Sequence, residues 1–185
     1  MKRKRKQNLR EKYPPSEPCS CEICTSFCMR PGWWTVKEAS RAIRAGYGNR
    51  MMLEVSPEFT FGVLSPAFKG CEMNFALQMF SQFGCTFFNK GLCDLHGTGY
   101  EPLECRFCHH SRKGLGRKCH SDIEKDWNTP KGQALVAKWD RMFSRDGDRF
   151  IVPIKGRGQV HCPNTKVIEL VIFIIRWYSF SLFWV

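Results

Sequence analysis

The stretch that decides the fold is residues 19–34, which read CSCEICTSFCMRPGWW. It places Cys19, Cys21, Cys24 and Cys28 within ten residues and closes with a Pro-Gly-Trp-Trp turn. Thiolates three or four residues apart on a tight turn can point at one ion, and zinc binds such sulfurs in a tetrahedron at about 2.3 Å. Iron–sulfur clusters use similar spacings. The stretch therefore predicts a metal centre, and burial of four cysteines as small apolar side chains is a poor alternative.

A second group of metal-ligating residue types lies between residues 85 and 120. Its cysteines follow the pattern C-x7-C-x11-C-x2-C, and the last pair has the spacing of a zinc knuckle. For any single histidine nearby, a satisfied or solvent-facing ring is the more common outcome. Adjacent side chains point apart on most backbones, so we expect at most one ligand from the pair His109 and His110. The predicted ligands are four cysteines, with two possible histidines: Cys85, Cys93, Cys105, Cys108, His96 and His109.

The order of these cysteines resembles that of the YkgJ-type cysteine-cluster family, also called the CxxCxxCC or zinc/iron-chelating domain. The stretches that carry the resemblance are 21–28 (CEICTSFC), 85–96 (CTFFNKGLCDLH) and 101–106 (EPLECR). Phe27 stands where the family has a cysteine, Glu101 where it has an arginine and His96 where it has a tyrosine. The resemblance covers about half the chain and implies a metal or iron–sulfur centre. One relative, the flagellin lysine methylase, carries such a module, so an enzymatic role stays open.

The number of cysteines allows more than one centre. The six cysteines of the family pattern exceed the four ligands of one structural zinc. Cys19 and Cys108 would complete two four-ligand centres, or a [4Fe–4S] cluster with spare thiols. The sequence leaves the partition open. Cys71 and Cys162 are expected to be ordinary thiols.

The net charge of +12 is concentrated in two segments. Residues 1–18 contain seven basic and two acidic residues, and residues 106–120 contain five basic residues and no acidic one. We predict that residues 1–18 form a disordered basic arm, because a Lys/Arg run cannot pack and prolines interrupt a helix. The arm is either a solvated tail or a contact for nucleic acid or another polyanion. The bases of the second segment are anion-binding candidates: Arg106, Arg112, Lys113, Arg117 and Lys118.

The composition, with 25% charged and 43% hydrophobic residues, excludes a wholly disordered or collagen-like chain. No apolar stretch follows the basic start, so we expect no export signal and a cytoplasmic location. In a reducing compartment, clustered cysteines hold metal more often than they form disulfides. We predict one metal-binding domain over residues 19–166.

Residues 167–185 read VIELVIFIIRWYSFSLFWV and form a separate hydrophobic segment. Nineteen residues are long enough to span a bilayer core as a helix, but Arg176 in the middle is costly there. The alternatives are a non-native end, a membrane tail and buried strands, in that order. A membrane is expected as a partner only if this segment is a genuine tail.

Local patterns predict few regular elements. Residues 35–38 (TVKE) form a capping box, which predicts the start of a helix that Gly46 suits as a stop. Residues 128–130 (NTP) predict a second helix with an apolar stripe at positions 135, 136, 139, 142 and 143. Short strands are expected over 59–64 and 150–154, and a basic loop over 111–118. The predicted fold is a small, irregular α+β, cysteine-rich metal-binding domain with short helices and few strands.

Three hypotheses for the function follow. The first is a metal-binding module, with zinc or an iron–sulfur cluster, whose metal is mainly structural. The second is an iron–sulfur enzyme of redox or methylase-like group-transfer chemistry, for which the sequence offers no C-x3-C-x2-C radical motif and no Rossmann fingerprint. The third is a zinc-knuckle module that binds nucleic acid or ribosomes through the two basic segments.

Overall fold

A computed structural model of the chain describes residues 9–17, 19–56, 60–76 and 83–143, and the backbone of two strands at 151–153 and 159–161. The helices (α), 3-10 helices (η) and strands (β) of this part are, in order, α1 (Leu9–Lys12), α2 (Glu22–Ser26), η1 (Phe27–Met29), α3 (Val36–Arg44), η2 (Tyr47–Arg50), β1 (Met51–Val55), β2 (Gly62–Pro66), β3 (Phe88–Asn89), β4 (Leu92–Cys93), η4 (Glu104–Phe107), η5 (His110–Arg112), α4 (Arg117–Trp127), α5 (Pro130–Phe143), β5 (Ile151–Pro153) and β6 (Gln159–His161). The predicted small, irregular α+β fold is confirmed.

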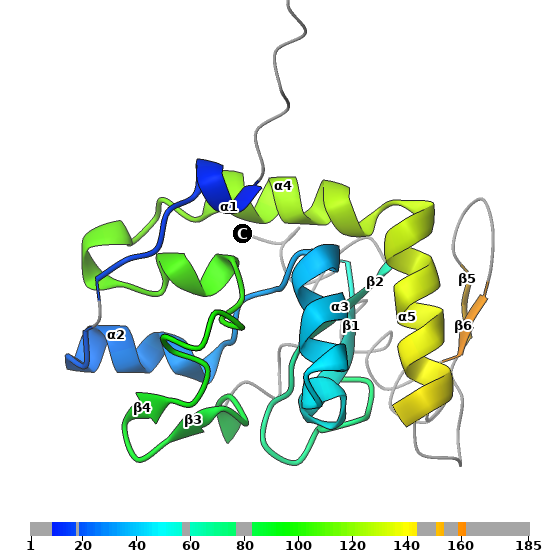
Figure 1. Cartoon of the computed structure of the whole chain (residues 1–185), viewed down its shortest axis with the longest axis horizontal. Helices are drawn as coiled ribbons and strands as arrows, with labels where there is room; N and C mark the ends of the chain where they lie inside the picture. Colours follow the sequence, from blue (N-terminus) through cyan, green and yellow to red (C-terminus); the bar gives the residue numbers. More distant parts are fainter. Residues whose placement is uncertain are drawn as a thin grey trace, which may run out of the picture.

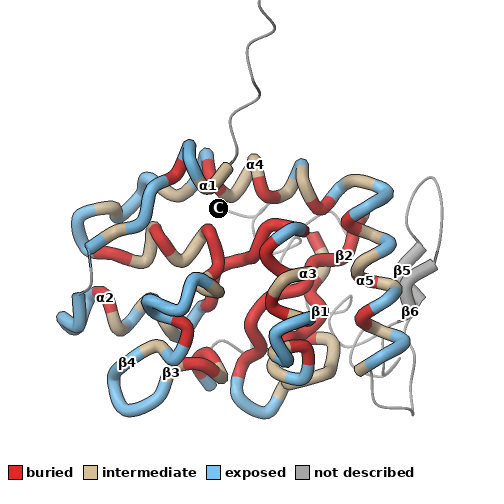
Figure 2. The backbone as a smooth tube through the Cα atoms, viewed as in Figure 1, coloured by how far each residue is buried: buried red, intermediate tan, exposed pale blue. Residues whose placement is uncertain are grey.

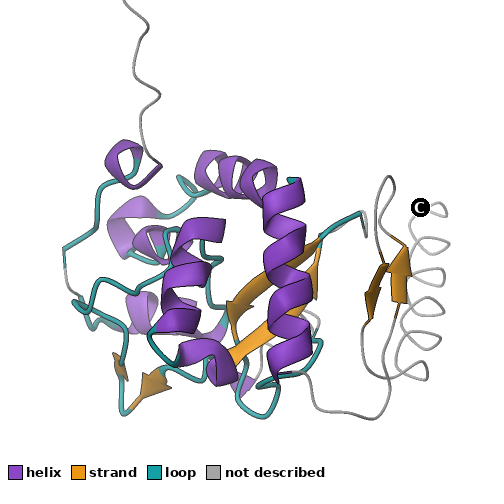
Figure 3. Cartoon of the chain, turned by 45° about the vertical axis from the view of Figure 1, so that its right-hand side comes forward, coloured by secondary structure: helices purple, strands orange, loops and turns teal. Residues whose placement is uncertain are grey.

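The centre of the fold is the antiparallel hairpin of β1 and β2, with α3 and α5 packed beside it (Figure 1). Met51 pairs with Pro66 and Val55 with Gly62, and nearly every residue of both strands is buried (Figure 2). Gln133 of α5 fixes the helix on the hairpin, because its side chain donates to the Gly62 carbonyl at 3.0 Å and accepts from the Gly62 N–H at 2.9 Å. Figure 3 shows α3 and α5 side by side across the strands.

Three buried tryptophans join the helices to the loops around them. The indole N–H of Trp127 donates to the Trp34 carbonyl at 2.7 Å, and that of Trp34 donates to the Tyr100 carbonyl at 2.8 Å. Trp139 donates in the same way to the Gly48 carbonyl at 2.8 Å. Buried indoles that satisfy their only donor give the core both apolar area and a fixed orientation. The last residues of the Pro-Gly-Trp-Trp turn are therefore part of the core.

The predicted helix after residue 35 is confirmed as α3. The Thr35 hydroxyl accepts from the Glu38 N–H at 3.2 Å, and the Thr35 N–H donates to the Glu38 carboxylate at 2.9 Å, which completes the capping box. Gly46 follows the helix with φ of 90°, a left-handed conformation that glycine adopts without strain. The Glu38 carboxylate also accepts from the Leu103 N–H at 3.2 Å. One local motif thus connects α3 to the segment that leads into η4.

The helix predicted from residues 128–130 is confirmed as α5, which begins at Pro130. Its stripe buries Val136 and Trp139, whereas Met142 is half exposed and does not belong to the core. The strand expected over 59–64 lies slightly later, as β2. The sequence analysis did not anticipate β1 or α4. Arg117 and Lys118, placed in the predicted basic loop, are the first two residues of α4.

The prediction of a disordered arm over residues 1–18 is wrong for residues 9–17. Residues 9–12 form α1, and Tyr13 is buried against Phe107 at a ring-centroid distance of 5.7 Å. Lys12 and the Tyr13 hydroxyl both donate to the Asp122 carboxylate of α4, at 2.5 and 2.8 Å. Residues 1–8 lie outside the described part. The N-terminal segment of the described chain is therefore a packed part of the domain.

Near the C-terminus, β5 lies within the strand predicted over 150–154 and pairs with β6 in an antiparallel arrangement. Among the residues that the structure describes, no helix combines the length and the apolar character needed to cross a membrane. The predicted hydrophobic segment 167–185 and Cys162 lie outside the described residues.

Candidate metal centre

The cysteines of residues 19–28 surround the short helix α2. Cys21 is the N-cap residue, Cys24 lies inside the helix and is buried, and Cys28 follows in η1. Because α2 has only five residues and continues into η1, its thiols are presented on a tight coil rather than along a long axis. The segment therefore has the local geometry that the cysteine spacing predicted.

Donor atoms from two distant parts of the chain meet at this coil. One ligand atom each from Cys19, Cys24, His109 and His110 lies within 4.8 Å of all the others. The Nδ1 atom of His110 is 3.4 Å from the Cys24 sulfur, 3.6 Å from the Cys19 sulfur and 3.7 Å from the Cys21 sulfur. The backbone N–H of His110 also donates to the Cys24 sulfur at 3.2 Å. This cluster of thiols and imidazoles can hold a metal ion.

The spacing matches the requirement of a tetrahedral zinc site. A zinc ion about 2.3 Å from sulfur and about 2.0–2.1 Å from nitrogen separates the two ligand atoms by about 3.6 Å. The three sulfur-to-Nδ1 distances, 3.4, 3.6 and 3.7 Å, lie on both sides of that value. His110 Nδ1 therefore lies at a distance compatible with shared metal coordination from three thiols, those of Cys19, Cys21 and Cys24.

The two adjacent histidines play different parts. His109 is buried and its Nδ1 atom accepts from the Ser111 N–H at 3.2 Å, with the Ser111 hydroxyl 2.7 Å away. The same Nδ1 atom can instead donate to the Ser111 hydroxyl, and the ring then keeps a lone pair on Nε2 for a metal ion. The two rings are tilted by 32° with their centroids 4.2 Å apart. The cluster therefore contains His109, which the sequence analysis chose as a possible ligand, and also His110, which it did not choose.

The thiols of the cluster differ in pKa. A hydrogen bond from the Cys24 backbone N–H, with smaller contributions from the Cys24 and Cys19 thiols, lowers the pKa of Cys21 to about 7. Burial raises the pKa of Cys24 to about 11. An exposed thiolate at Cys21 can therefore capture a cation first, and the cation then favours ionisation of the buried partner.

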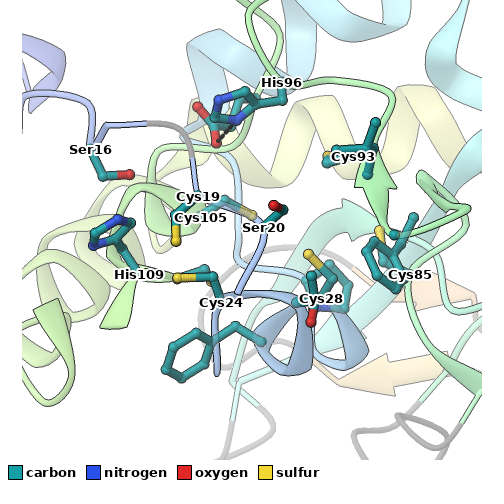
Figure 4. Close-up of a pocket in the computed structure, with 18 of the residues that line it drawn as sticks. Ser16, Cys19, Ser20, Cys24, Cys28, Cys85, Cys93, His96, Cys105 and His109 are labelled. Atoms are coloured by element: carbon teal, nitrogen blue, oxygen red, sulfur yellow. Dashed lines mark ion pairs between the residues drawn. The ribbon is translucent and has the colours of Figure 1, made fainter. Parts of the chain in front are cut away.

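A cavity of about 440 Å³ lies beside the cluster and is lined in part by Cys19, Cys24 and His109. Figure 4 shows these side chains at one end of the hollow and Cys28, Cys85 and Cys93 at the other. The further cysteines that line it are Cys28, Cys85, Cys93, Cys105 and Cys108. All eight cysteines that were predicted as ligands therefore lie at the cluster or around this cavity.

Other predicted site residues have other surroundings. His96 lines the cavity but is exposed, and its Nδ1 atom lies 3.4 Å from the Glu101 carboxylate. Arg106 and Arg112 were predicted to bind anions, yet both donate to backbone carbonyls of the N-terminal segment. Arg106 is buried and contacts the Arg10 and Tyr13 carbonyls, and Arg112 contacts those of Pro14 and Pro15 at 2.7 and 2.8 Å. Lys113, Arg117 and Lys118 are exposed.

The sequence analysis missed His110 because its position depends on a long-range contact. Adjacent side chains do point differently here, but the sequence alone does not say which ring faces Cys24, 86 residues earlier. The sequence did offer one signal at Ser111, because a hydroxyl two residues after His109 can form a hydrogen bond with the ring of that histidine. Cys71, predicted as an ordinary thiol, packs apart from the cluster against the small core of Met52 and Phe68.

The fold and the cluster define a small cysteine-rich α+β protein with a site able to hold a metal ion. No protein-family model, curated protein or solved structure matches this chain.

Proposed function

We propose that the chain is a metal-binding module in which a structural zinc ion is held by Cys19, Cys21, Cys24 and His110. The observation that carries the proposal is the set of three sulfurs at 3.4–3.7 Å from one imidazole nitrogen. Four protein ligands fill a tetrahedral zinc, and a closed site is typical of structural rather than catalytic zinc. The metal therefore acts on the fold of the protein.

The position of the centre explains what such a metal would do. It joins the coil around α2 to η5, and η5 in turn holds the N-terminal segment through Arg112, which donates to the Pro14 and Pro15 carbonyls. Lacking a long hydrophobic helix, residues 19–30 have little apolar area with which to hold themselves in place. Zinc binding would supply that free energy, because ligands that only meet in the folded state couple binding to folding.

The resemblance to the YkgJ-type family is part of this proposal. Five of the six cysteines of the family pattern line one cavity, and the sixth, Cys21, lies at the cluster beside it. The resemblance adds a role for iron or zinc in a module of this size. An iron–sulfur enzyme of redox or group-transfer chemistry remains a prediction.

Zinc titration of the full chain tests the structural zinc. His110→Ala should weaken zinc binding by more than about tenfold, since even residues that only orient ligands contribute about 10–100-fold. His96→Ala is the matched control, because His96 is exposed like His110 but its Nδ1 atom lies against the Glu101 carboxylate and away from the Cys/His cluster. Equal zinc affinity in wild type, His110→Ala and Cys24→Ser would contradict the assignment.

A nucleic-acid partner is the second candidate, and the position of α1 favours it. Residues 1–8 carry five bases and lead directly into α1, which Lys12 anchors to α4 through Asp122 at 2.5 Å. The first turn of α4 presents the exposed residues Arg117 and Lys118. Both basic segments thus attach to one helix. Binding of a labelled RNA oligonucleotide should weaken steeply with salt, and more so than in an Arg117→Gln/Lys118→Gln variant.

A further inference from the structure

Two of the thiols around α2 form a C-x2-C pair at the first turn of that helix. Cys21 is the N-cap residue, and Cys24 is the third residue of α2. The backbone N–H and the thiol of Cys24 are both hydrogen-bonded to the Cys21 sulfur. Both cysteines are free thiols. The two sulfur atoms that a disulfide would join are therefore already in contact within one helical turn.

An imidazole lies against both of these sulfurs. The Nδ1 atom of His110 is 3.7 Å from the Cys21 sulfur and 3.4 Å from the Cys24 sulfur. A basic group beside a thiol can accept its proton when the sulfur attacks as a nucleophile. The cluster therefore contains a sulfur nucleophile, a second thiol and a proton acceptor within contact distance of one another.

The two thiols differ in their access to solvent. Cys21 is exposed, whereas Cys24 is buried, with 5% of its surface accessible. A dissolved oxidant thus reaches Cys21 first, and Cys24 is placed to react with Cys21 rather than with the oxidant. Cysteines that respond to oxidants are typically accessible to solvent and lie beside a second cysteine that completes the disulfide.

Cys105 and Cys108 provide a comparison within the same chain, because they have the same C-x2-C spacing. Their thiols are also hydrogen-bonded to each other. Neither of them is exposed, however, and the Cys105 sulfur accepts a hydrogen bond from the Gly32 N–H at 3.3 Å. The spacing and the thiol contact are therefore common to both pairs, whereas exposure to solvent distinguishes Cys21.

We propose that Cys21 and Cys24 are a dithiol pair that hydrogen peroxide oxidises to a disulfide, and that this disulfide and the zinc ion exclude each other. The oxidation itself does not need the metal, whereas its effect on zinc rests on the proposed function. The pair is thus a site of reversible covalent modification at the start of α2. A thiol reductant returns it to the metal-binding form.

The reaction takes place in two steps. The Cys21 sulfur attacks one oxygen of the peroxide, the O–O bond breaks, and the departing oxygen leaves as water with the proton of the thiol. The Cys24 sulfur then attacks the sulfenic acid at Cys21, the S–O bond breaks, and a second water leaves with the Cys24 proton. Two thiols lose two electrons in total, and one peroxide is reduced to two water molecules.

The disulfide removes two of the four proposed zinc ligands and leaves only Cys19 and His110. A disulfide sulfur is no longer a thiolate, which is the form of cysteine that binds metal. The bond also joins residues within a single helical turn, so it cannot replace the link that zinc makes between α2 and η5. Oxidation should therefore release zinc and free residues 19–30 from η5.

The first experiment uses the full chain, freed of metal by a chelator and of reductant, and treated with hydrogen peroxide. Peptide mass spectrometry with fragmentation should locate a disulfide between Cys21 and Cys24. It should form at least about tenfold faster than one between Cys105 and Cys108, because access of the oxidant governs the rate. Cys24→Ser should instead accumulate a sulfenic acid at Cys21, which dimedone labels.

Two matched variants control for the neighbouring thiols. Cys108→Ser removes the other C-x2-C pair, and Cys19→Ser removes the third sulfur beside His110, so both should keep the rate of wild type. A disulfide in wild type that joins Cys21 to Cys19, or that forms first between Cys105 and Cys108, would overturn the proposal. The location of the disulfide in wild type decides the question even if a serine variant does not fold.

Zinc tests the second half of the proposal. At a zinc concentration about 100 times the Kd, about 1% of the protein is metal-free, so oxidation of wild type should slow by more than about tenfold. Peroxide added to the zinc-loaded protein should release zinc to a chromogenic indicator, and dithiothreitol should restore zinc binding. Zinc that stays bound after the disulfide has formed would overturn the mutual exclusion.

The two proposals fail in different ways. A chain that forms the disulfide but binds no zinc before or after reduction would contradict the zinc site and support the dithiol pair. A chain that binds zinc but forms no Cys21–Cys24 disulfide in its metal-free state would contradict the dithiol pair and support the zinc site.

Discussion

The Nδ1 atom of His110 lies 3.4 Å from the sulfur of Cys24, although 86 residues separate the two in the sequence. The contact joins α2, a helix too short to be stable by itself, to η5 near the start of α4. Arg106 and Arg112 hold the residues before α2 through backbone carbonyls. Residues 19–30, in which Cys24 is the only buried residue, are therefore held by polar contacts and, as we propose, by a metal, whereas the helices and the hairpin that follow are held by an apolar core.

Removal of zinc should loosen that N-terminal part selectively. With a chelator present, amide hydrogen exchange over residues 19–30 should accelerate by more than about tenfold. Zinc that binds only the folded form lowers the population of the locally opened state, and its removal restores that population. Amides of β1 and β2 should keep their rates, since these strands are buried and do not contact the cluster. Exchange measured by mass spectrometry with and without chelator checks this. An acceleration spread evenly over both parts would contradict a local role for the metal.

Cys21 should be the first thiol to react with iodoacetamide in the metal-free protein. It is exposed and its pKa is lowered to about 7, so about half of it is thiolate at neutral pH. Cys71 is the internal control, because burial raises the pKa of its thiol. The alkylation rate at Cys21 should rise to half its maximum near pH 7, and zinc should protect it. Peptide mass mapping gives both rates, and equal reactivity of the two thiols would refute the expectation.

Local signals in the sequence predicted the elements that local chemistry determines. The capping box of Thr35 and Glu38 and the proline at position 130 fix where α3 and α5 begin, since each acts within one helical turn. The cysteines around α2 were found for the same reason. In α4, the buried residues Cys119, Ile123 and Trp127 recur every fourth position. That stripe was a usable signal that the analysis did not apply.

Long-range contacts determined what the sequence could not predict. Which face of the His109–His110 pair meets α2 depends on how η5 packs, and nothing within a few residues of either ring encodes it. Arg106 and Arg112 resembled anion-binding residues because a charge count does not reveal which carbonyls lie nearby in the fold. The partition of the cysteines into two groups depends on the same packing.

Gly32→Ala should destabilise the fold. A Cβ at position 32 would lie 2.7 Å from the Glu104 Cβ and 2.8 Å from the Cys105 nitrogen, so the Pro-Gly turn could no longer approach η4. Overpacking of this kind costs about 1–3 kcal/mol. The shift would also break the hydrogen bond that the Gly32 N–H donates to the Cys105 sulfur at 3.3 Å.

Gly70→Ala is the control for this variant. Gly70 has φ of 84° and open space around its Cβ position, so alanine there strains only the backbone, by about 1–2 kcal/mol. Urea unfolding of both variants measures these losses of stability. An unchanged free energy of unfolding in Gly32→Ala would mean that the turn can move away from η4 without cost.

The hydrogen bonds that Lys12 and Tyr13 donate to Asp122 of α4 should weaken in acid. Hydrogen bonds from Lys12 and then from Tyr13 lower the pKa of Asp122 below its ordinary value of 3.8. A carboxyl with a depressed pKa in the folded state stabilises the fold above the unfolded value, and the contribution disappears as the pH falls through the folded value. The free energy of unfolding of metal-free wild type should therefore exceed that of Asp122→Asn at pH 7, and the gap should shrink as the pH falls below about 4.

Urea denaturation of both proteins between pH 7 and pH values below 4 measures the difference in the free energy of unfolding. Lys125→Gln tests whether any positive charge near Asp122 has the same effect as Lys12. Lys125 lies 3.8 Å from the other Asp122 oxygen and is largely exposed, so its removal should change stability by less than about 0.5 kcal/mol at either pH. Tyr13→Phe should reproduce part of the Asp122→Asn effect, because it removes one of the two donors. A gap between wild type and Asp122→Asn that stays constant with pH would show that ionised Asp122 does not hold the N-terminal segment on α4.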